Sequence, residues 1–255
     1  ILFSACQKNN ITSEDKIVNP SNLRRQCATM EVFAEQLKAD PALAIRMQSI
    51  ENFTTTFESD KNNFSNLRLV NGMVEIPVVV NVLYRTTAEN ISQAQIQSQI
   101  DVLNEDYNAT NTDISKIPAI FSNLKGNYGI RFVLDQVVRK ATTKKSWSTN
   151  NAMKKSTQGG INPTSPTTKL NIWSCTLGGG ILGYAQFPGG ASATDGVVIL
   201  NTAFGRTGTV SAPYNLGRTA THEVGHWLNL RHIWGDATCG SDLVSDTPTA
   251  QTANY

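Results

Sequence analysis

The stretch His222–His232, with the sequence HEVGHWLNLRH, contains all three histidines of a 255-residue chain. Residues four apart lie on the same face of a helix, so His222 and His226 can direct two imidazole nitrogens at one ion. Glu223 follows the first histidine, where its carboxylate can serve as a general base without being a ligand. The H-E-x-x-H pattern also occurs by chance, so it does not identify a site alone.

The third histidine strengthens the prediction of a metal site. On a straight helix His232 would lie roughly 9 Å beyond His226, out of reach of a shared ion. The helix must therefore end between them, and Asn229 is a residue type that tolerates the left-handed conformation of such an end. A coincidental gathering of histidines is the alternative. We predict that His222, His226 and His232 bind one zinc ion.

Three nitrogen ligands and an open fourth position are typical of a catalytic zinc site rather than a structural one. Zinc lowers the pKa of a bound water molecule to about 7. Glu223 would take the proton of the attacking water and pass it to the leaving amine of a peptide bond. The predicted chemistry is zinc-dependent hydrolysis.

The composition argues against nucleic acid as a partner. The net charge is +2, charged residues make up 16% of the chain and hydrophobic residues 40%, without the basic stripe of a nucleic-acid surface. A short basic run, expected to be a solvated loop face, consists of Lys140, Lys144, Lys145, Lys154 and Lys155. No stretch reaches the roughly 20 apolar residues that span a bilayer.

The first residues, ILFSACQKNN, indicate export. Ser4 and Ala5 precede Cys6 as in a bacterial lipobox, where a signal peptide is removed and the new N-terminal cysteine is lipidated. We therefore expect residues 1–6 to be a signal remnant and the protein to be secreted or held on the surface of a bacterium, as an outer-membrane lipoprotein. An ordinary apolar terminus with a free cysteine is the alternative.

The four cysteines do not form a C-x-x-C pair, which argues against a cysteine zinc knuckle. Export permits disulfide bonds. Cys175 and Cys239 are one candidate pair, and Cys239 with a cysteine beyond this sequence is another.

An N-terminal region is expected to precede the main domain. Residues 30–53 carry apolar residues at helical spacing, interrupted by Asp40-Pro41, and predict two short helices. Residues 54–72 form a polar connector, so we assign residues 7–75 to a pro-region and connector.

The main domain is predicted to have an α+β fold. An amphipathic helix is expected over Ser92–Asp106, with Ser92 as its N-cap, and a long loop over Lys140–Pro166. The predicted strands are Ile76–Tyr84, Gly129–Val138, Leu170–Cys175, Leu182–Phe187 and Gly196–Leu200.

The motif and its surroundings resemble a known family. The segments GRTATHEVGHWLNLRHIWGD, LNIWSCTLGGGILGYAQFPGG and ATDGVVIL resemble the pappalysin family of metzincin zinc peptidases, in particular its bacterial cytophagalysin-like branch. The resemblance extends from Ile76 to the end of the chain. It implies a mixed sheet with an active-site helix, and an N-terminal catalytic subdomain over residues 76–232.

The resemblance also implies a strand above the cleft that pairs with an extended substrate, here Leu182, Gly183, Tyr184, Ala185 and Gln186. A glycine-rich turn leading into an edge strand suits the addition of a peptide strand. An ordinary sheet strand is the alternative.

Two further sites are expected by analogy with the family. Such enzymes are made as latent precursors, and a thiolate binds zinc well, so Cys27 is a candidate fourth ligand in the latent form. Removal of roughly the first 55–75 residues would then activate the enzyme. Calcium is expected at Asp242, Asp246 and Thr247. The alternatives are a packed cysteine and carboxylates that cap turns.

The sequence departs from the family at two points. Asn229 replaces the usual glycine, and no methionine follows the third histidine, because Met30, Met47, Met73 and Met153 all lie upstream. Residues 233–255 are therefore expected to begin a truncated C-terminal subdomain that lacks the methionine turn.

The sequence thus predicts a secreted zymogen of a zinc endopeptidase that acts on proteins or peptides. A zinc-binding surface lipoprotein without turnover is the main alternative, since the truncated form could be inactive, and an amidase acting on other substrates is a third. Glu223 favours an enzyme, because a pure metal binder has no use for that carboxylate.

Overall fold

The computed structural model of the protein describes residues 26–59, 69–245 and 247–253. In these ranges six strands form one mixed sheet, in the spatial order β1-β5-β6-β4-β2-β3. The strands are β1 (Gln26–Cys27), β2 (Val74–Tyr84), β3 (Ile130–Ala141), β4 (Leu170–Cys175), β5 (Ile181–Ala185) and β6 (Val197–Leu200). The helices are α1 (Thr29–Ala39), α2 (Ala42–Ser59), α3 (Gln93–Tyr107) and α4 (Arg218–Trp227). The predicted α+β class is confirmed.

The centre of the sheet is parallel. β2 runs parallel to both β3 and β4, and β4 runs parallel to β6. β5 pairs antiparallel with β6, and β1 runs parallel to β5. Side chains of β4 and β6 are buried throughout, which explains why the sequence of β6 is a continuous apolar run rather than an alternating pattern. β4 is mostly apolar as well, but it also buries the polar side chains of Asn171 and Ser174.

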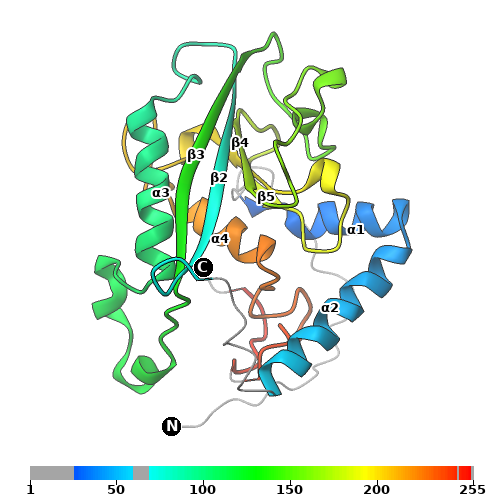
Figure 1. Ribbon diagram of the computed structural model, residues 1–255, viewed down its shortest axis with the longest axis vertical. Coiled ribbons are helices and arrows are strands. Elements are labelled where there is room, and N and C mark those ends of the chain that lie inside the picture. Colours follow the sequence, from blue (N-terminus) through cyan, green and yellow to red (C-terminus); the bar gives the residue numbers. More distant parts are fainter. Residues whose placement is uncertain (1–25, 60–68, 246, 254–255) are drawn as a thin grey trace, which may run out of the picture.

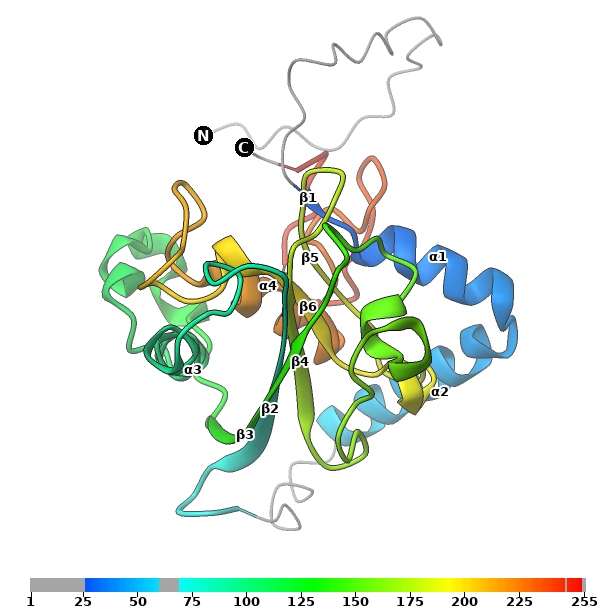
Figure 2. The same cartoon turned by 90° about the horizontal axis from the view of Figure 1, so that it is seen from above.

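Helices α3 and α4 pack on one face of the sheet (Figures 1 and 2). The core between them joins alternate residues of β2 with one face of α3, and its members include Val78, Val80, Val82, Ile96, Ile100 and Leu103. The hydroxyl of Ser92 accepts a hydrogen bond from the Gln95 amide at 3.1 Å, so the predicted N-cap is confirmed.

The other face of the sheet is covered by the segment that follows β3, which we expected to be a solvated loop. Trp147 and Met153 are buried there against Trp173 and Tyr184. Lys154 is only 1% exposed, so the solvated position predicted for it is wrong. Its ammonium donates to the carbonyl oxygens of residues 194 and 196 at 2.7 and 3.2 Å, and burial lowers its pKa to about 7.

The N-terminal segment Gln26–Ser59 contains β1, α1 and α2 and packs against β5 and Phe187. The predicted break at Asp40-Pro41 is confirmed, but α2 continues to Ser59, into the stretch predicted to be a connector. The hydroxyls of Thr55 and Thr56 donate to the carbonyl oxygens four residues earlier, which lets polar residues remain in the helix.

Strand β1 lies at the edge of the sheet, beside β5. The prediction that the Leu182–Phe187 strand has a free edge is therefore wrong for this chain, because β1 covers it. In the described ranges, every helix is too short or too polar to traverse a bilayer.

Candidate metal centre

Helix α4 positions the first two histidines and then ends as the sequence predicts. The Leu228 amide donates to the Val224 carbonyl at 2.9 Å, and the Leu230 amide reaches back to Gly225 at 2.9 Å. Asn229 between them has a φ of 79°, the left-handed conformation that ends a helix. This reversal returns His232 to the side of the helix that carries His222.

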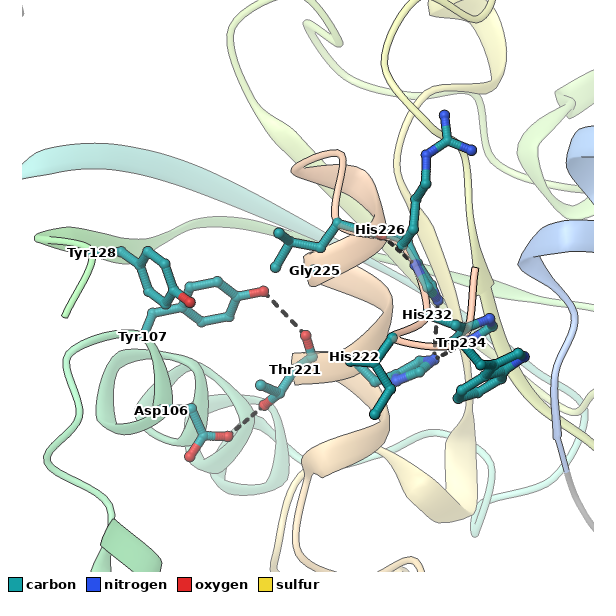
Figure 3. Close-up of a pocket in the computed structure, with 12 residues that line it drawn as sticks. Asp106, Tyr107, Tyr128, Thr221, His222, Gly225, His226, His232 and Trp234 are labelled. Carbon is teal, nitrogen blue, oxygen red and sulfur yellow. Dashed lines mark hydrogen bonds between the residues drawn. The ribbon is translucent and has the colours of Figure 1, made fainter. Parts of the chain in front are cut away.

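The three imidazoles converge on one point (Figure 3). The Nε2 atom of His222 lies 3.0 Å from that of His226 and 3.3 Å from that of His232. A tetrahedral zinc ion with nitrogens at 2.0–2.1 Å holds them about 3.3 Å apart. The residues present therefore fit zinc.

Hydrogen bonds at the far ring nitrogens orient the ligands. The Nδ1 atom of His226 is 2.7 Å from the Leu230 carbonyl oxygen, and that of His232 is 2.6 Å from the Asp236 carboxylate. If Nδ1 carries the proton, each Nε2 lone pair is free for a metal. Burial lowers the pKa of His222 to about 3 and that of His226 to about 4, so both rings are neutral near pH 7, the form that binds metal.

Cys27 lies at the same point. Its Sγ atom and one nitrogen of each histidine all lie within 4.8 Å of one another, and no other group of this kind occurs in the described part of the chain. Strand β1 places the thiol there: it runs parallel to β5, and the Ala28 amide donates to the Gly183 carbonyl at 3.0 Å.

Glu223 is 1% exposed beside the four candidate ligands. Burial raises the pKa of its carboxyl to about 8, while hydrogen bonds from Thr29 and Cys27 act in the opposite direction. The Thr29 hydroxyl donates to Oε2 at 2.9 Å and the Cys27 thiol at 3.4 Å. Burial, and then the neighbouring Glu223 carboxylate, raise the pKa of the Cys27 thiol above its usual range; a bound cation would reverse this effect and favour the thiolate.

Gly183 of β5 is required for this arrangement. A Cβ atom there would lie 3.0 Å from Cγ of Glu223 and 2.9 Å from the Val198 carbonyl oxygen. Both distances are shorter than ordinary contacts, so any side chain would displace the carboxylate or the strand.

Sequence reasoning missed three contributors to the site. Thr29 bridges Glu223 and β5, because its hydroxyl also accepts a hydrogen bond from the Ala185 amide at 2.9 Å. Asp236 orients the His232 ring through a hydrogen bond. The Trp234 ring stacks on the His232 ring, with 4.4 Å between the ring centres and an angle of 5° between the ring planes. The position of Asp236, four residues after a predicted ligand histidine, could have indicated its role from the sequence. Nothing in the sequence around Thr29 indicates its contact with Glu223.

The opposite side of α4 is fixed by α3. The Thr221 hydroxyl donates to the Asp106 carboxylate at 2.6 Å, and the Tyr107 hydroxyl donates to the Thr221 carbonyl at 3.1 Å (Figure 3). These contacts hold the first turn of α4 and border a cavity of about 350 Å³ that reaches the three histidines.

Of the predicted calcium and lipidation residues, the structure describes Asp242 and Thr247. Asp242 is buried and accepts a hydrogen bond from the Val244 amide at 3.0 Å, as a turn cap does. Thr247 donates its amide weakly to the Val244 carbonyl at 3.4 Å. Asp246 and Cys6 lie outside the described residues. Asp242 is not part of the group of candidate ligands around the histidines.

Cys175 is a free, fully buried thiol at the end of β4. It packs among Trp173, Leu200 and their neighbours in the core. The candidate disulfide between Cys175 and Cys239 is therefore wrong.

The predicted substrate residues alternate across the sheet. Leu182 and Tyr184 belong to the core on the side away from α4, whereas Gly183 and Ala185 face α4. Gln186 is 1% exposed, and its amide donates to the Ala191 carbonyl at 2.9 Å.

The known proteins that this chain is similar to are metallopeptidases. Residues 174–255 match the peptidase family described as pregnancy-associated plasma protein-A. Extracellular metalloprotease 1 of Coccidioides posadasii is 32% identical over 188 residues, which cover 69% of this chain and 58% of that protein. The extracellular metalloprotease of Pyricularia oryzae is 35% identical over 191 residues, which cover 70% of this chain and 58% of that protein. The chain thus spans 58% of the length of these two relatives.

Two solved structures of Tannerella forsythia proteins are similar to this one. Mature mirolysin in complex with a cleaved peptide is 46% identical, with a TM-score of 0.70 over 71% of this chain and 74% of that one. A promirolysin variant is 40% identical, with a TM-score of 0.74 over 90% of this chain and 76% of that one. By its motif, fold and relatives, the chain belongs to the pappalysin family of metzincin metallopeptidases.

Proposed function

We propose that the protein is a zinc-dependent endopeptidase, held latent by its N-terminal segment Gln26–Ser59. The observation that carries this proposal is the convergence of three histidine nitrogens and the Cys27 sulfur beside a buried glutamate. The nitrogens have the spacing of zinc ligands, and Glu223 is adjacent without being one of them.

Zinc held by His222, His226 and His232 would acidify a water molecule and polarise a peptide carbonyl. Glu223 would accept a proton at its carboxylate and deliver it to the leaving amine. Its raised pKa, about 8 in the metal-free chain, suits a group that must bind and release a proton near neutral pH. Asp236 and the Leu230 carbonyl would keep two imidazoles in the ligand tautomer.

The N-terminal segment opposes each of these steps. Cys27 would fill the fourth ligand position, Thr29 binds the general base, and β1 covers the edge of β5. The promirolysin variant covers 90% of this chain against 71% for mature mirolysin, which supports a comparable pro-segment. Its removal would expose β5 for pairing with an extended peptide.

The same relatives support an extracellular role. Two are named extracellular metalloproteases, and mirolysin was solved with a cleaved peptide, so protein or peptide substrates outside the cell are proposed here. Lipidation of Cys6 and calcium binding by Asp242, Asp246 and Thr247 remain proposals from the sequence. We propose that residues 7–75 form the pro-region and connector and that residues 76–232 form the N-terminal catalytic subdomain.

The test is peptide cleavage by the full-length protein after removal of the pro-segment, beside its Glu223→Gln variant. We expect one zinc per chain in both proteins and loss of turnover by at least about a hundredfold in the variant. One zinc per chain with no turnover in either protein would instead favour the non-catalytic zinc-binding protein.

A further inference from the structure

Helix α2 contacts the loop that joins the second and third histidines. The side-chain amide nitrogen Nδ2 of Asn229 donates to Oε1 of Glu51 at 3.0 Å, and the Arg231 guanidinium lies 3.7 Å from the same oxygen. Figure 1 shows α2 beside the chain that follows α4. Two side chains of the histidine loop thus hold one carboxylate of the N-terminal segment.

Glu51 is the one acidic partner of Arg231 in the described ranges. The side chain of Arg231 is 22% exposed. Its Nε atom and Oδ1 of Asn229 are buried without a hydrogen-bond partner among the described residues. Departure of Glu51 would leave this partly buried cation without a carboxylate partner in the described part of the chain, which is unfavourable unless another anion replaces it.

This carboxylate contact lies at the Phe187 end of β5. The Arg231 guanidinium lies 5.8 Å from the centre of the Phe187 ring, and that ring lies 5.5 Å from the His226 ring. The Phe33 ring of α1 meets Phe187 edge-on at 5.3 Å. The N-terminal segment therefore presents an aromatic ring and a carboxylate to the surface formed by Phe187, Asn229 and Arg231, just beyond the C-terminal end of β5.

We infer that Asn229 and Arg231 form a binding site for a peptide carboxylate, filled by Glu51 in the latent chain and by an acidic substrate side chain after activation. The inference rests on the proposed function for the identity of the second ligand. Phe187 supplies the adjoining apolar surface, so the favoured peptide carries an acidic residue near an apolar one, on the side of the scissile bond toward Phe187.

The experiment compares peptides that differ only in carrying Glu, Gln or Lys at one position, scanned along both sides of the scissile bond. The zinc-loaded protein, after removal of its pro-segment, should prefer Glu over Gln at one of the scanned positions. There, its kcat/KM for the Glu peptide should be at least about fivefold higher than for the Gln peptide. Arg231→Gln should abolish this preference and Arg231→Lys should keep part of it. Arg206→Gln, which breaks a surface pair with Glu105, should leave it intact.

Binding of the same peptides to the Glu223→Gln variant, with zinc content checked, gives a second readout that needs no turnover. Equal cleavage and equal binding of Glu and Gln peptides would overturn the carboxylate site while leaving the endopeptidase proposal in place. Tighter binding of the Glu peptide that depends on Arg231, without any cleavage, would support the site and overturn the endopeptidase.

Discussion

At the scale of single residues, Glu223 shows how burial changes the protonation of a carboxyl group. Its carboxyl is buried against β5, and its hydrogen bonds come from Thr29 and Cys27 of the N-terminal segment. The same burial that raises its pKa makes the ionised form costly in the absence of a metal. The residue predicted to be the base is thus also a source of pH dependence.

Metal-free protein should therefore lose stability relative to Glu223→Gln as the pH rises. The pKa of the carboxyl is about 8 in the folded chain against an ordinary value of 4.5, so the folded state binds its proton more tightly than the unfolded state. That contribution is complete below the ordinary value and is lost as the pH rises toward the folded value. Urea unfolding between about pH 5 and pH 8 should show a difference on the order of 1 kcal/mol per pH unit. Parallel curves for the two proteins would contradict this account.

Gly183→Ala should impair catalysis by displacing Glu223. The added methyl group would meet Cγ of Glu223 and the Val198 carbonyl at about 3 Å. We expect kcat of the activated enzyme to fall on the order of tenfold to a hundredfold. Gly178→Ala is the matched control, because its Cβ would meet nothing closer than 3.5 Å. Similar losses in both variants would show that the effect is not specific to the carboxylate.

At the scale of elements, the end of α4 decides whether three histidines can share an ion. The helical spacing and Asn229 were sufficient to predict this end, because a left-handed residue is the simplest means to bring His232 back. The strands were predictable for a similar reason, since β-branched runs such as Val78–Val80 have few other stable conformations in a core.

Other elements carry no local signal. Strand β1 has two residues and exists because β5 offers free backbone groups. The final turns of α2 contain threonines that favour helix weakly, and their hydroxyl bonds became visible only in the structure. Lys154 resembles its exposed neighbours in sequence, and only the carbonyl oxygens and aromatic rings around it account for its burial.

Asn229→Gly should preserve the metal site, whereas Asn229→Val should damage it. Glycine adopts the required φ of 79° without strain, but a β-branched residue there costs at least about 1–2 kcal/mol. Thermal unfolding together with zinc titration will separate the two variants. Equal zinc affinity in both would show that the left-handed residue does not control the position of His232.

At the scale of the whole molecule, the N-terminal segment covers the edge of β5 and the histidine cluster. Besides β1, its helices bury Leu43 and Met47 against Phe187, and Arg46 donates to the Gly189 carbonyl at 2.7 Å. In the latent form that we propose, the contacts that hold the segment in place thus extend far from the three histidines. Sequence periodicity indicated helices here but not the surface on which they dock, because that surface is formed by residues distant in sequence, such as Phe187 and Gly189.

Leu43→Ala should loosen the N-terminal segment and hasten activation. Leu43 is 2% exposed, and its truncation is expected to remove about 2–5 kcal/mol of packing energy. Limited proteolysis of the intact protein should release the segment faster. Ile45→Ala on the same helix, at a side chain that is 71% exposed, should behave as the unmodified protein. Equal rates in all three proteins would exclude this packing as a source of latency.

The central claim is that one zinc ion joins the three histidines to Cys27 in the intact chain. Zinc-edge X-ray absorption of the intact zinc-loaded protein tests it most directly. We predict three nitrogen neighbours near 2.0 Å and one sulfur near 2.3 Å, with the sulfur lost in Cys27→Ser and after removal of the pro-segment. A shell of nitrogen and oxygen alone in the intact protein would contradict the account.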